Sequence, residues 1–223
     1  MKKHTRTNHE KGLTFIELIV VISIFAIMGS IVLFRFDSFN KKIALDTLAQ
    51  DIALRIVEAQ KAAISGVSNA NFSSGALVPA YGVYFRSAVS AGADNTKFVY
   101  FNDTITDRKY STNPATACPL TPSLLSECLA ETTITSGDYV SNICYITASG
   151  IKSCAGTGSL ALHVSFKRPF PDASLLLDPN ITADRAYVEV SSRDGAMQKT
   201  ITINSLGHVS VVNGKACTIL GLC

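Results

Sequence analysis

The sequence predicts an α+β protein in which one long N-terminal helix packs on an antiparallel β-sheet head. Two patterns indicate the helix: an apolar run over residues 13–34, and apolar residues spaced three or four apart over residues 45–63. A third pattern indicates the sheet, because short runs of β-branched and aromatic residues alternate with turn-forming residues after Gly66. A helix with one apolar stripe buries that stripe against a sheet, so we expect a single core.

Residues 13–36 form the transmembrane half of the expected helix. Glu17 is the only charged residue among the 22 residues from Leu13 to Phe34. A helix of that length measures about 33 Å and crosses a hydrocarbon core of roughly 30 Å. Basic residues precede the run at positions 2, 3, 6 and 11, and basic flanks are kept in the cytoplasm. We therefore expect a single-pass protein of the cytoplasmic membrane with an extracytoplasmic head.

Residues 37–66 form the amphipathic half of the same helix. The apolar stripe consists of Leu45, Leu48, Ile52, Ile56, Ala59 and Ala63, with charged residues at intervening positions. Gly66 predicts the end of the helix, because glycine favours the backbone conformation that follows a last helical turn. The pair Gly29-Ser30 marks a point where the helix can bend.

Residues 67–223 form the expected β-rich head. Its last three strands are separated by the turn sequences Arg-Asp-Gly and Ser-Leu-Gly, which indicate an antiparallel meander. The expected strands are residues 81–85, 97–101, 143–148, 160–166, 186–192, 199–204 and 208–212.

The net charge of +3 is confined to the first twelve residues, and the rest of the chain carries equal numbers of positive and negative residues. The sequence therefore does not predict a broad basic surface that could bind nucleic acid. The basic pair Lys167-Arg168 could contact DNA, but the neutral charge of the remainder weighs against DNA as a partner.

The six cysteines fall into three close pairs, each of which we expect to form a disulfide. Fifteen pairings are possible, and short loops cost the least entropy to close. Disulfides require an oxidising compartment, which export of the head would provide. The last pair would keep the C-terminal residues from fraying, or would present a recognition loop. The expected pairs are Cys118 with Cys128, Cys144 with Cys154, and Cys217 with Cys223.

The sequence contains no complete catalytic constellation, so we do not expect an enzyme. Ser149 and Lys152 match a Ser-x-x-Lys nucleophile motif, but the companion motifs are missing and a turn within a cysteine-closed hairpin is the simpler interpretation. Gly156-Thr-Gly158 lacks the third glycine of a dinucleotide-binding loop and precedes a strand, so it indicates a turn.

No cofactor is expected, and calcium is the one metal for which a candidate segment exists. Acidic and amide side chains at Asp172, Asp178, Asn180 and Asp184 surround one loop, although without the spacing of a calcium-binding loop. His163 and His208 lie in strand patterns without other ligand residues at metal-site spacing. Both are expected to be ordinary core or surface histidines.

The leader differs from that of a secretory signal peptide, whose cleavage site follows the apolar run. Here Gly12 precedes the run, and an uncleaved anchor is one interpretation. The stretch Lys-Gly-Leu-Thr-Phe-Ile-Glu-Leu-Ile-Val-Val-Ile resembles the processing and methylation motif of type IV prepilins and pseudopilins. The resemblance implies that residues 1–12 are removed after Gly12 and that Leu13, where the family usually has Phe, becomes N-methylated. Thr14, Phe15, Ile16 and Glu17 complete the motif.

The resemblance also implies that Glu17 is an assembly residue, which pairs with the terminal ammonium of Leu13 in a neighbouring subunit. Implied partners are other pilin or pseudopilin subunits, the membrane, and the prepilin peptidase and methyltransferase. The head resembles, loosely, that of a minor type II secretion pseudopilin. A minor subunit of a type IV pilus or a secretion pseudopilus is thus expected. The alternative is a monomeric, membrane-anchored binding or enzymatic domain.

Overall fold

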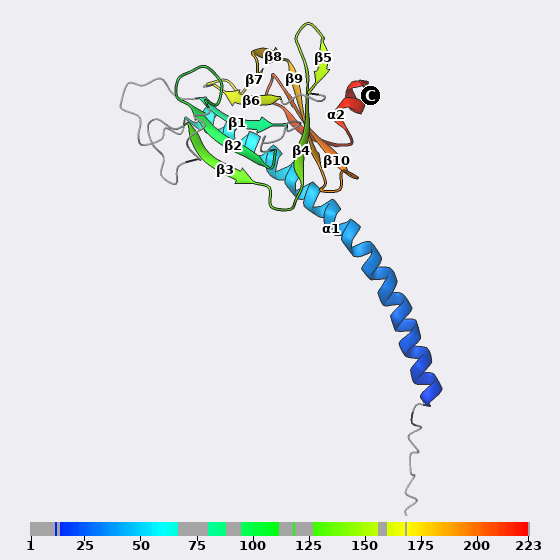
Figure 1. Ribbon diagram of the computed structural model, residues 1–223. Coiled ribbons are helices and arrows are strands. Elements are labelled where there is room, and N and C mark those ends of the chain that lie inside the picture. The colour runs from blue at the N-terminus through cyan, green and yellow to red at the C-terminus, as the bar shows by residue number, and fades with distance from the viewer. Residues whose placement is uncertain are drawn as a thin grey trace, which may run out of the picture. The chain divides into compact units, whose positions relative to one another are not determined.

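The computed structural model describes residues 12, 14–66, 80–87, 95–111, 118, 127–155, 160–167 and 169–222, without the side chains of residues 31–35 and 37. The chain divides into two units, Met1–Lys41 and Lys42–Cys223. The second unit contains the end of the long helix and all the described strands (Figure 1). The α+β class predicted from the sequence is confirmed.

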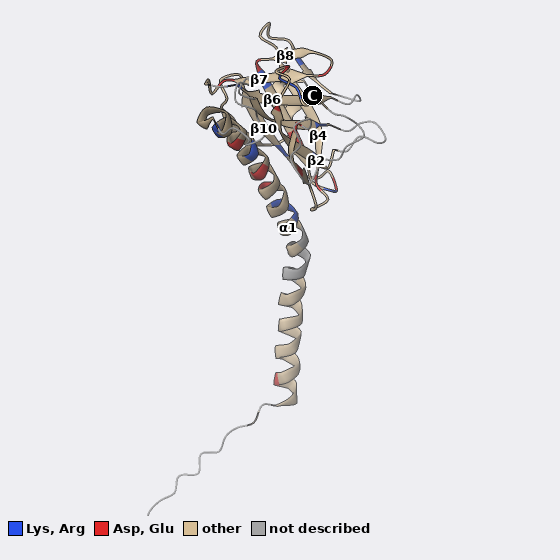
Figure 2. Cartoon of the chain, turned by 90° about the vertical axis from the view of Figure 1, so that its left-hand side faces the viewer, with Lys and Arg blue, Asp and Glu red and all other residues tan. Residues whose placement is uncertain are grey.

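Helix α1 spans Phe15–Ser65, close to the predicted limits, and continues through Gly29 and Ser30. In the first unit its side chains are almost entirely uncharged, and Figure 2 shows a single acidic position near its start, which is Glu17. Large apolar side chains there are exposed: Phe15, Ile16, Phe25, Ile27 and Met28 each have more than half of their surface accessible. In the part of the chain that the structure describes, no helical stretch meets the length and hydropathy needed to cross a membrane.

The second unit contains two antiparallel sheets, whereas the sequence predicted one. The first sheet has the order β3-β2-β1-β6-β7-β8, and the second has the order β11-β10-β9-β4-β5. The strands of the first are β1 Ala80–Arg86, β2 Lys97–Asp103, β3 Cys128–Thr133, β6 Ala161–Phe166, β7 Ala173–Leu177 and β8 Ile181–Ala183. Those of the second are β4 Tyr139–Ile146, β5 Lys152–Cys154, β9 Arg185–Ser191, β10 Gln198–Asn204 and β11 Val209–Asn213. The short helix α2, Ala216–Leu220, follows β11.

All seven predicted strands are present, and the meander of β9, β10 and β11 is confirmed. The sequence prediction missed the strands β3, β7 and β8 and helix α2, and it included β5 only as the second arm of the hairpin closed by Cys144 and Cys154. Residues 128–133, Cys-Leu-Ala-Glu-Thr-Thr, form an edge strand that includes Ala and Glu, two residue types that are depleted in strands. The others contain only three to five residues, so each provides little pattern from which to recognise it.

One hydrophobic core joins the end of α1 to both sheets. The predicted stripe is buried, from Leu45 through Ala63, against side chains such as Phe85 of the first sheet and Val188 of the second. Two polar contacts fix the helix on the head. Asp46 pairs with Lys199 of β10, and the Gln60 side-chain amide donates to the carbonyl oxygen of Pro171 at 2.9 Å.

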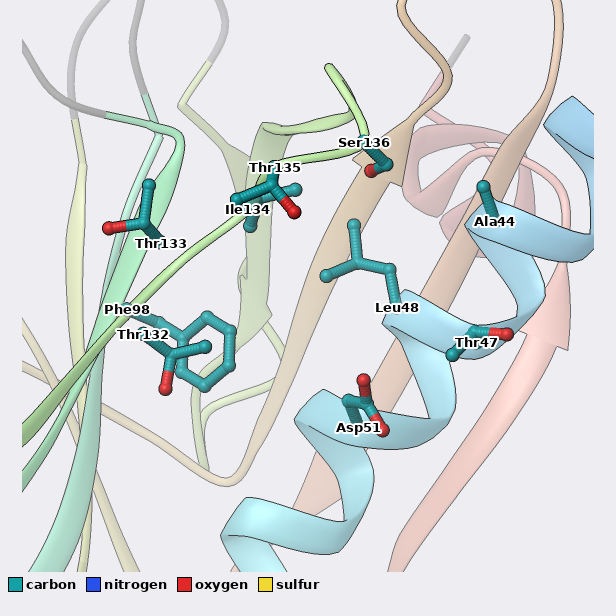
Figure 3. Close-up of a pocket in the computed structure, with 10 residues that line it drawn as sticks. All are labelled: Ala44, Thr47, Leu48, Asp51, Phe98, Thr132, Thr133, Ile134, Thr135 and Ser136. Atoms are coloured by element: carbon teal, nitrogen blue, oxygen red, sulfur yellow. The ribbon is translucent and has the colours of Figure 1, made fainter.

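A groove of about 290 Å³ separates residues 44–51 of α1 from the edge strand β3 and the loop after it (Figure 3). Leu48 and Phe98 line it with apolar surface, and Asp51 is its only charged residue. Hydroxyl groups supply most of the remaining polar atoms, from Thr47, Thr132, Thr133, Thr135 and Ser136. The groove therefore offers hydroxyls and one carboxylate, but no cation.

Residues 104–111, which we call the strap, cover the outer face of the central strands of the six-stranded sheet. Tyr110 of the strap packs in a second cluster with Tyr84 and Phe101, whose rings lie 5.2 and 5.5 Å from its own. Because both faces of the sheet are covered there, the central strands β1 and β6 are buried on both sides.

Candidate processing and assembly site

Helix α1 begins with a hydrogen-bonded cap made by Thr14 and Glu17. The backbone N–H and the hydroxyl of Thr14 both donate to one carboxylate oxygen of Glu17, at 3.1 and 2.9 Å. The N–H of Glu17 reaches back to the Thr14 hydroxyl at 3.4 Å. This reciprocal arrangement is a capping box, which satisfies backbone donors that the first turn of a helix leaves without partners.

The residues around this cap are accessible to a processing enzyme. Gly12, Thr14, Phe15 and Ile16 are exposed, and a side chain built at Gly12 would meet nothing within 4 Å. Leu13, the expected first mature residue, lies outside the described residues. Gly12 is thus exposed, and a regular helix begins three residues after it.

No hydrogen-bond partner for Glu17 within its own chain was predicted from the sequence. In the single chain Glu17 already accepts two hydrogen bonds from Thr14. The Thr-x-x-Glu spacing ahead of an apolar run is itself a signal for such a cap, and it could have been recognised from the sequence. Glu17 therefore has a local role as a cap besides any role in assembly.

An exposed glycine ahead of a capped apolar helix with one early acidic residue is the kind of N-terminus on which prepilins are processed. Residues 7–33 match the family model described as the prokaryotic N-terminal methylation motif. The chain therefore carries a prepilin-type N-terminal methylation motif, which supports its assignment to the type IV prepilins and pseudopilins. Neither the curated proteins nor the solved structures provide a match to this chain.

Two of the three predicted disulfides are present. Cys118 is bonded to Cys128 and Cys144 to Cys154. The second disulfide joins directly opposite residues of β4 and β5, so the expected hairpin is also present. Cys217 of helix α2 is disulfide-bonded too, and its predicted partner Cys223 lies outside the described residues.

The residues of the Ser-x-x-Lys motif point to different partners. The Ser149 hydroxyl lies 2.8 Å from the Thr147 hydroxyl, within the tight turn of the hairpin. The Lys152 ammonium donates to the carbonyl oxygen of Leu220 at the end of α2, at 3.2 Å. Lys152 thus stabilises a helix C-terminus, where cations are favoured. The Gly156–Gly158 stretch is outside the described residues.

The acidic loop considered for calcium is occupied by protein cations and hydroxyls. Asp178 and Asn180, in the turn between β7 and β8, both accept hydrogen bonds from the Lys109 ammonium. Asp184 accepts from the Ser205 hydroxyl at 2.8 Å, and Asp172 is exposed. Among the described residues, no group of three His, Cys, Asp or Glu side chains is arranged to hold a metal ion.

His163 is buried on the outer face of β6 and holds the strap. Its Nδ1 accepts the backbone N–H of Tyr110 at 2.9 Å, so this nitrogen carries no proton, while Nε2 lies 3.5 Å from Asp178. Burial lowers the pKa of His163, although Asp178 opposes that effect. The prediction of an ordinary histidine missed this contact, because the strap lies about fifty residues earlier in the sequence. His208 is exposed.

Two buried carboxylates hold the same strap, and no sequence pattern indicated them. Asp103 accepts the backbone N–H groups of Asp107 and Arg108, at 3.2 and 2.8 Å. Glu127 accepts the N–H groups of Thr104 and Ser111, at 3.1 and 2.7 Å. Burial raises the pKa of both carboxyls, while these hydrogen bonds act in the opposite direction.

Proposed function

We propose that this chain is a prepilin-like structural subunit that is cleaved after Gly12, N-methylated at Leu13 and built into a type IV pilus or a secretion pseudopilus. Its N-terminal segment carries the methylation motif over residues 7–33. The apolar run 13–34 would first hold the chain in the cytoplasmic membrane as a single-pass anchor, with the head outside the cytoplasm.

The exposed apolar surface of α1 is the observation that carries the proposal. Leu18, Ile19, Val20, Val21 and Ile22 are consecutive in the helix, and each is close to half exposed or more. Consecutive residues point in all directions around a helix, so no single face of the head could cover them. A helix that is apolar all round requires lipid or other helices around it. Lipid would surround this helix before assembly, and the helices of neighbouring subunits would surround it afterwards.

The charged group in this segment fits the same proposal. In a bundle of staggered helices, Glu17 would face the ammonium that cleavage creates on Leu13 of a neighbour. Attraction between opposite charges is stronger in a low-dielectric environment than in water, and each charge offsets the desolvation of the other. We propose a structural role and no enzymatic one, because the sequence contains no complete catalytic constellation. The length of the chain and its cysteine-closed loops favour a minor subunit.

Processing can be tested with a charged residue at the cleavage position. The variant Gly12→Glu should retain the leader and stay in the membrane fraction, whereas the unaltered chain should appear among fibres sheared from the cell surface. The matched control Gly29→Ala lies in the same helix, where a Cβ meets nothing within 4 Å, and it should be processed normally. Normal cleavage of Gly12→Glu, or the absence of the unaltered chain from every fibre, would favour a monomeric anchored domain instead.

A further inference from the structure

A cavity of about 460 Å³ lies on the outer face of the six-stranded sheet, beside the strap. Its floor comes from β6, β7 and β8, and its rim comes from the strap, the loop after β6 and the turn after β10. This volume is in the usual range for small-molecule sites. The polar and aromatic lining residues are Arg108, Ser165, Lys167, Phe170, Asp172, Ser174, Thr182 and Ser205.

Arg108 lies at the rim in a backbone conformation that residues other than glycine rarely adopt. Its φ is 65°, in the left-handed region. The buried Asp103 carboxylate accepts its N–H at 2.8 Å, and the Ser165 hydroxyl donates to its carbonyl oxygen at 3.3 Å. Unfavourable backbone conformations persist where the surroundings enforce them, and they are concentrated at functional sites. The buried contacts of the strap thus fix the backbone of Arg108 at the rim of the cavity.

The cavity has an excess of positive charge. Arg108 and Lys167 face it, and within the described part of the chain neither has an ion-pair partner. Among the described residues of the lining, Asp172 is the only acidic one. A planar guanidinium binds a carboxylate through two parallel hydrogen bonds, and an ammonium adds a second charge.

Hydroxyls and one aromatic ring complete the lining. The side chains of Ser174 and Thr182 stand on the outer face of β7 and β8, where Ser174 is directly opposite Ser165 of β6. Phe170 is 64 % exposed at the rim, so a ligand can contact its apolar ring without displacing other side chains of the protein. Such hydroxyls suit a ligand that both donates and accepts hydrogen bonds at several positions.

We propose that this cavity binds a carboxylated sugar. The carboxylate pairs with Arg108 and Lys167, the sugar hydroxyls bond to the serine and threonine hydroxyls and to Asp172, and one ring face covers Phe170. Nucleic acid fits less well, because Asp172 would face a phosphate chain and residues 13–223 carry equal numbers of positive and negative residues. The inference concerns the head alone and holds whether or not the chain enters a filament.

The test is calorimetric titration of the full chain in detergent with trigalacturonate, compared with its neutral methyl ester. The acid should bind and the ester should bind at least about tenfold more weakly, because only the acid engages the two cations. Lys167→Gln and Arg108→Asn should each weaken binding of the acid by about tenfold. Asparagine tolerates a positive φ, so Arg108→Asn removes the charge without adding backbone strain.

Lys215→Gln removes an exposed cation outside this cavity and should leave the affinity unchanged. Retained thermal stability of each variant separates loss of the site from loss of the fold. Equal affinity for acid and ester, unchanged affinity in both cavity variants, or no binding at millimolar concentration would overturn the proposal. Binding of a single-stranded oligonucleotide in place of the sugar acid would overturn it as well.

Discussion

At the residue scale, Glu17 combines two roles that different substitutions can separate. Its carboxylate accepts hydrogen bonds from Thr14 in the single chain, and its charge is the feature that the proposed assembly requires. A glutamine keeps an acceptor oxygen for the cap and removes the charge. An alanine at position 14 removes the capping hydroxyl and leaves the charge in place.

We therefore predict that Glu17→Gln is cleaved normally but is lost from fibres, because the neighbour's ammonium has no counter-charge. Thr14→Ala should still enter fibres, with a loss of about 1 kcal/mol at the helix start. Immunoblots of membrane and sheared-fibre fractions measure both variants. Equal incorporation of Glu17→Gln and the unaltered chain would show that Glu17 serves only as a cap.

His163 makes the stability of the head depend on pH. Its pKa is lowered in the folded protein, so the unfolded chain binds the proton more readily and the histidine's stabilising contribution is lost as pH falls below about 6.5. A protonated Nδ1 would also place a donor against the Tyr110 N–H. Asp103 and Glu127 act in the opposite direction, since a raised carboxyl pKa favours the folded state at lower pH.

The contribution of His163 can be isolated with His163→Asn, whose amide oxygen can accept the Tyr110 N–H and does not titrate. We predict that the stability advantage of the unaltered chain over this variant shrinks between pH 7 and pH 5. The carboxyl effects are common to both proteins and cancel in the difference. Thermal unfolding followed by near-ultraviolet circular dichroism provides the two curves. Parallel curves over this range would contradict the role assigned to His163.

At the scale of elements, the centre of the six-stranded sheet depends on a close approach at Gly82. This residue of β1 lies between Phe101 of β2 and Ser165 of β6. A Cβ at this position would lie 2.6 Å from the Cζ atom of Phe101 and closer still to the carbonyl oxygen of Val164. Neither a buried ring nor a strand backbone can move aside freely in a closely packed core.

Gly82→Ala should therefore reduce the free energy of unfolding by about 2 kcal/mol or more, in the upper part of the range for overpacked cores. The control Thr133→Ala changes an exposed residue of the edge strand β3 and should stay within about 0.5 kcal/mol. Urea unfolding of both variants measures the difference. Equal stability of the two would mean that β1 and its neighbours repack around the added methyl group.

The same scale shows which parts of the fold a single sequence can reveal. The burial of the stripe from Leu45 to Ala63 could be predicted from the sequence, because helical periodicity is a local property. The division into two sheets was not predictable, since β1 pairs with β6 across about eighty residues and no local pattern encodes that choice. The strap contacts of Asp103, Glu127 and His163 were missed for the same reason. Tertiary contacts, not periodicity, bury these polar groups.

At the scale of the whole molecule, the chain consists of a segment that needs other helices or lipid and a head that carries its own core. The N-terminal segment was predictable in detail, because Gly12, Glu17 and the apolar run are contiguous and the motif over residues 7–33 is matched. The head has a cavity whose residues come from four separate regions of the sequence. Its proposed ligand could therefore be inferred only from the folded chain.

The central claim is that the chain is processed as a prepilin, and the mass of its mature N-terminus tests it most directly. Mass spectrometry of the protein isolated from its native membranes should find a chain that begins at an N-methylated Leu13. Residues 1–12 should be missing from it. A chain that begins at Met1, or at any residue after the apolar run, would contradict the account.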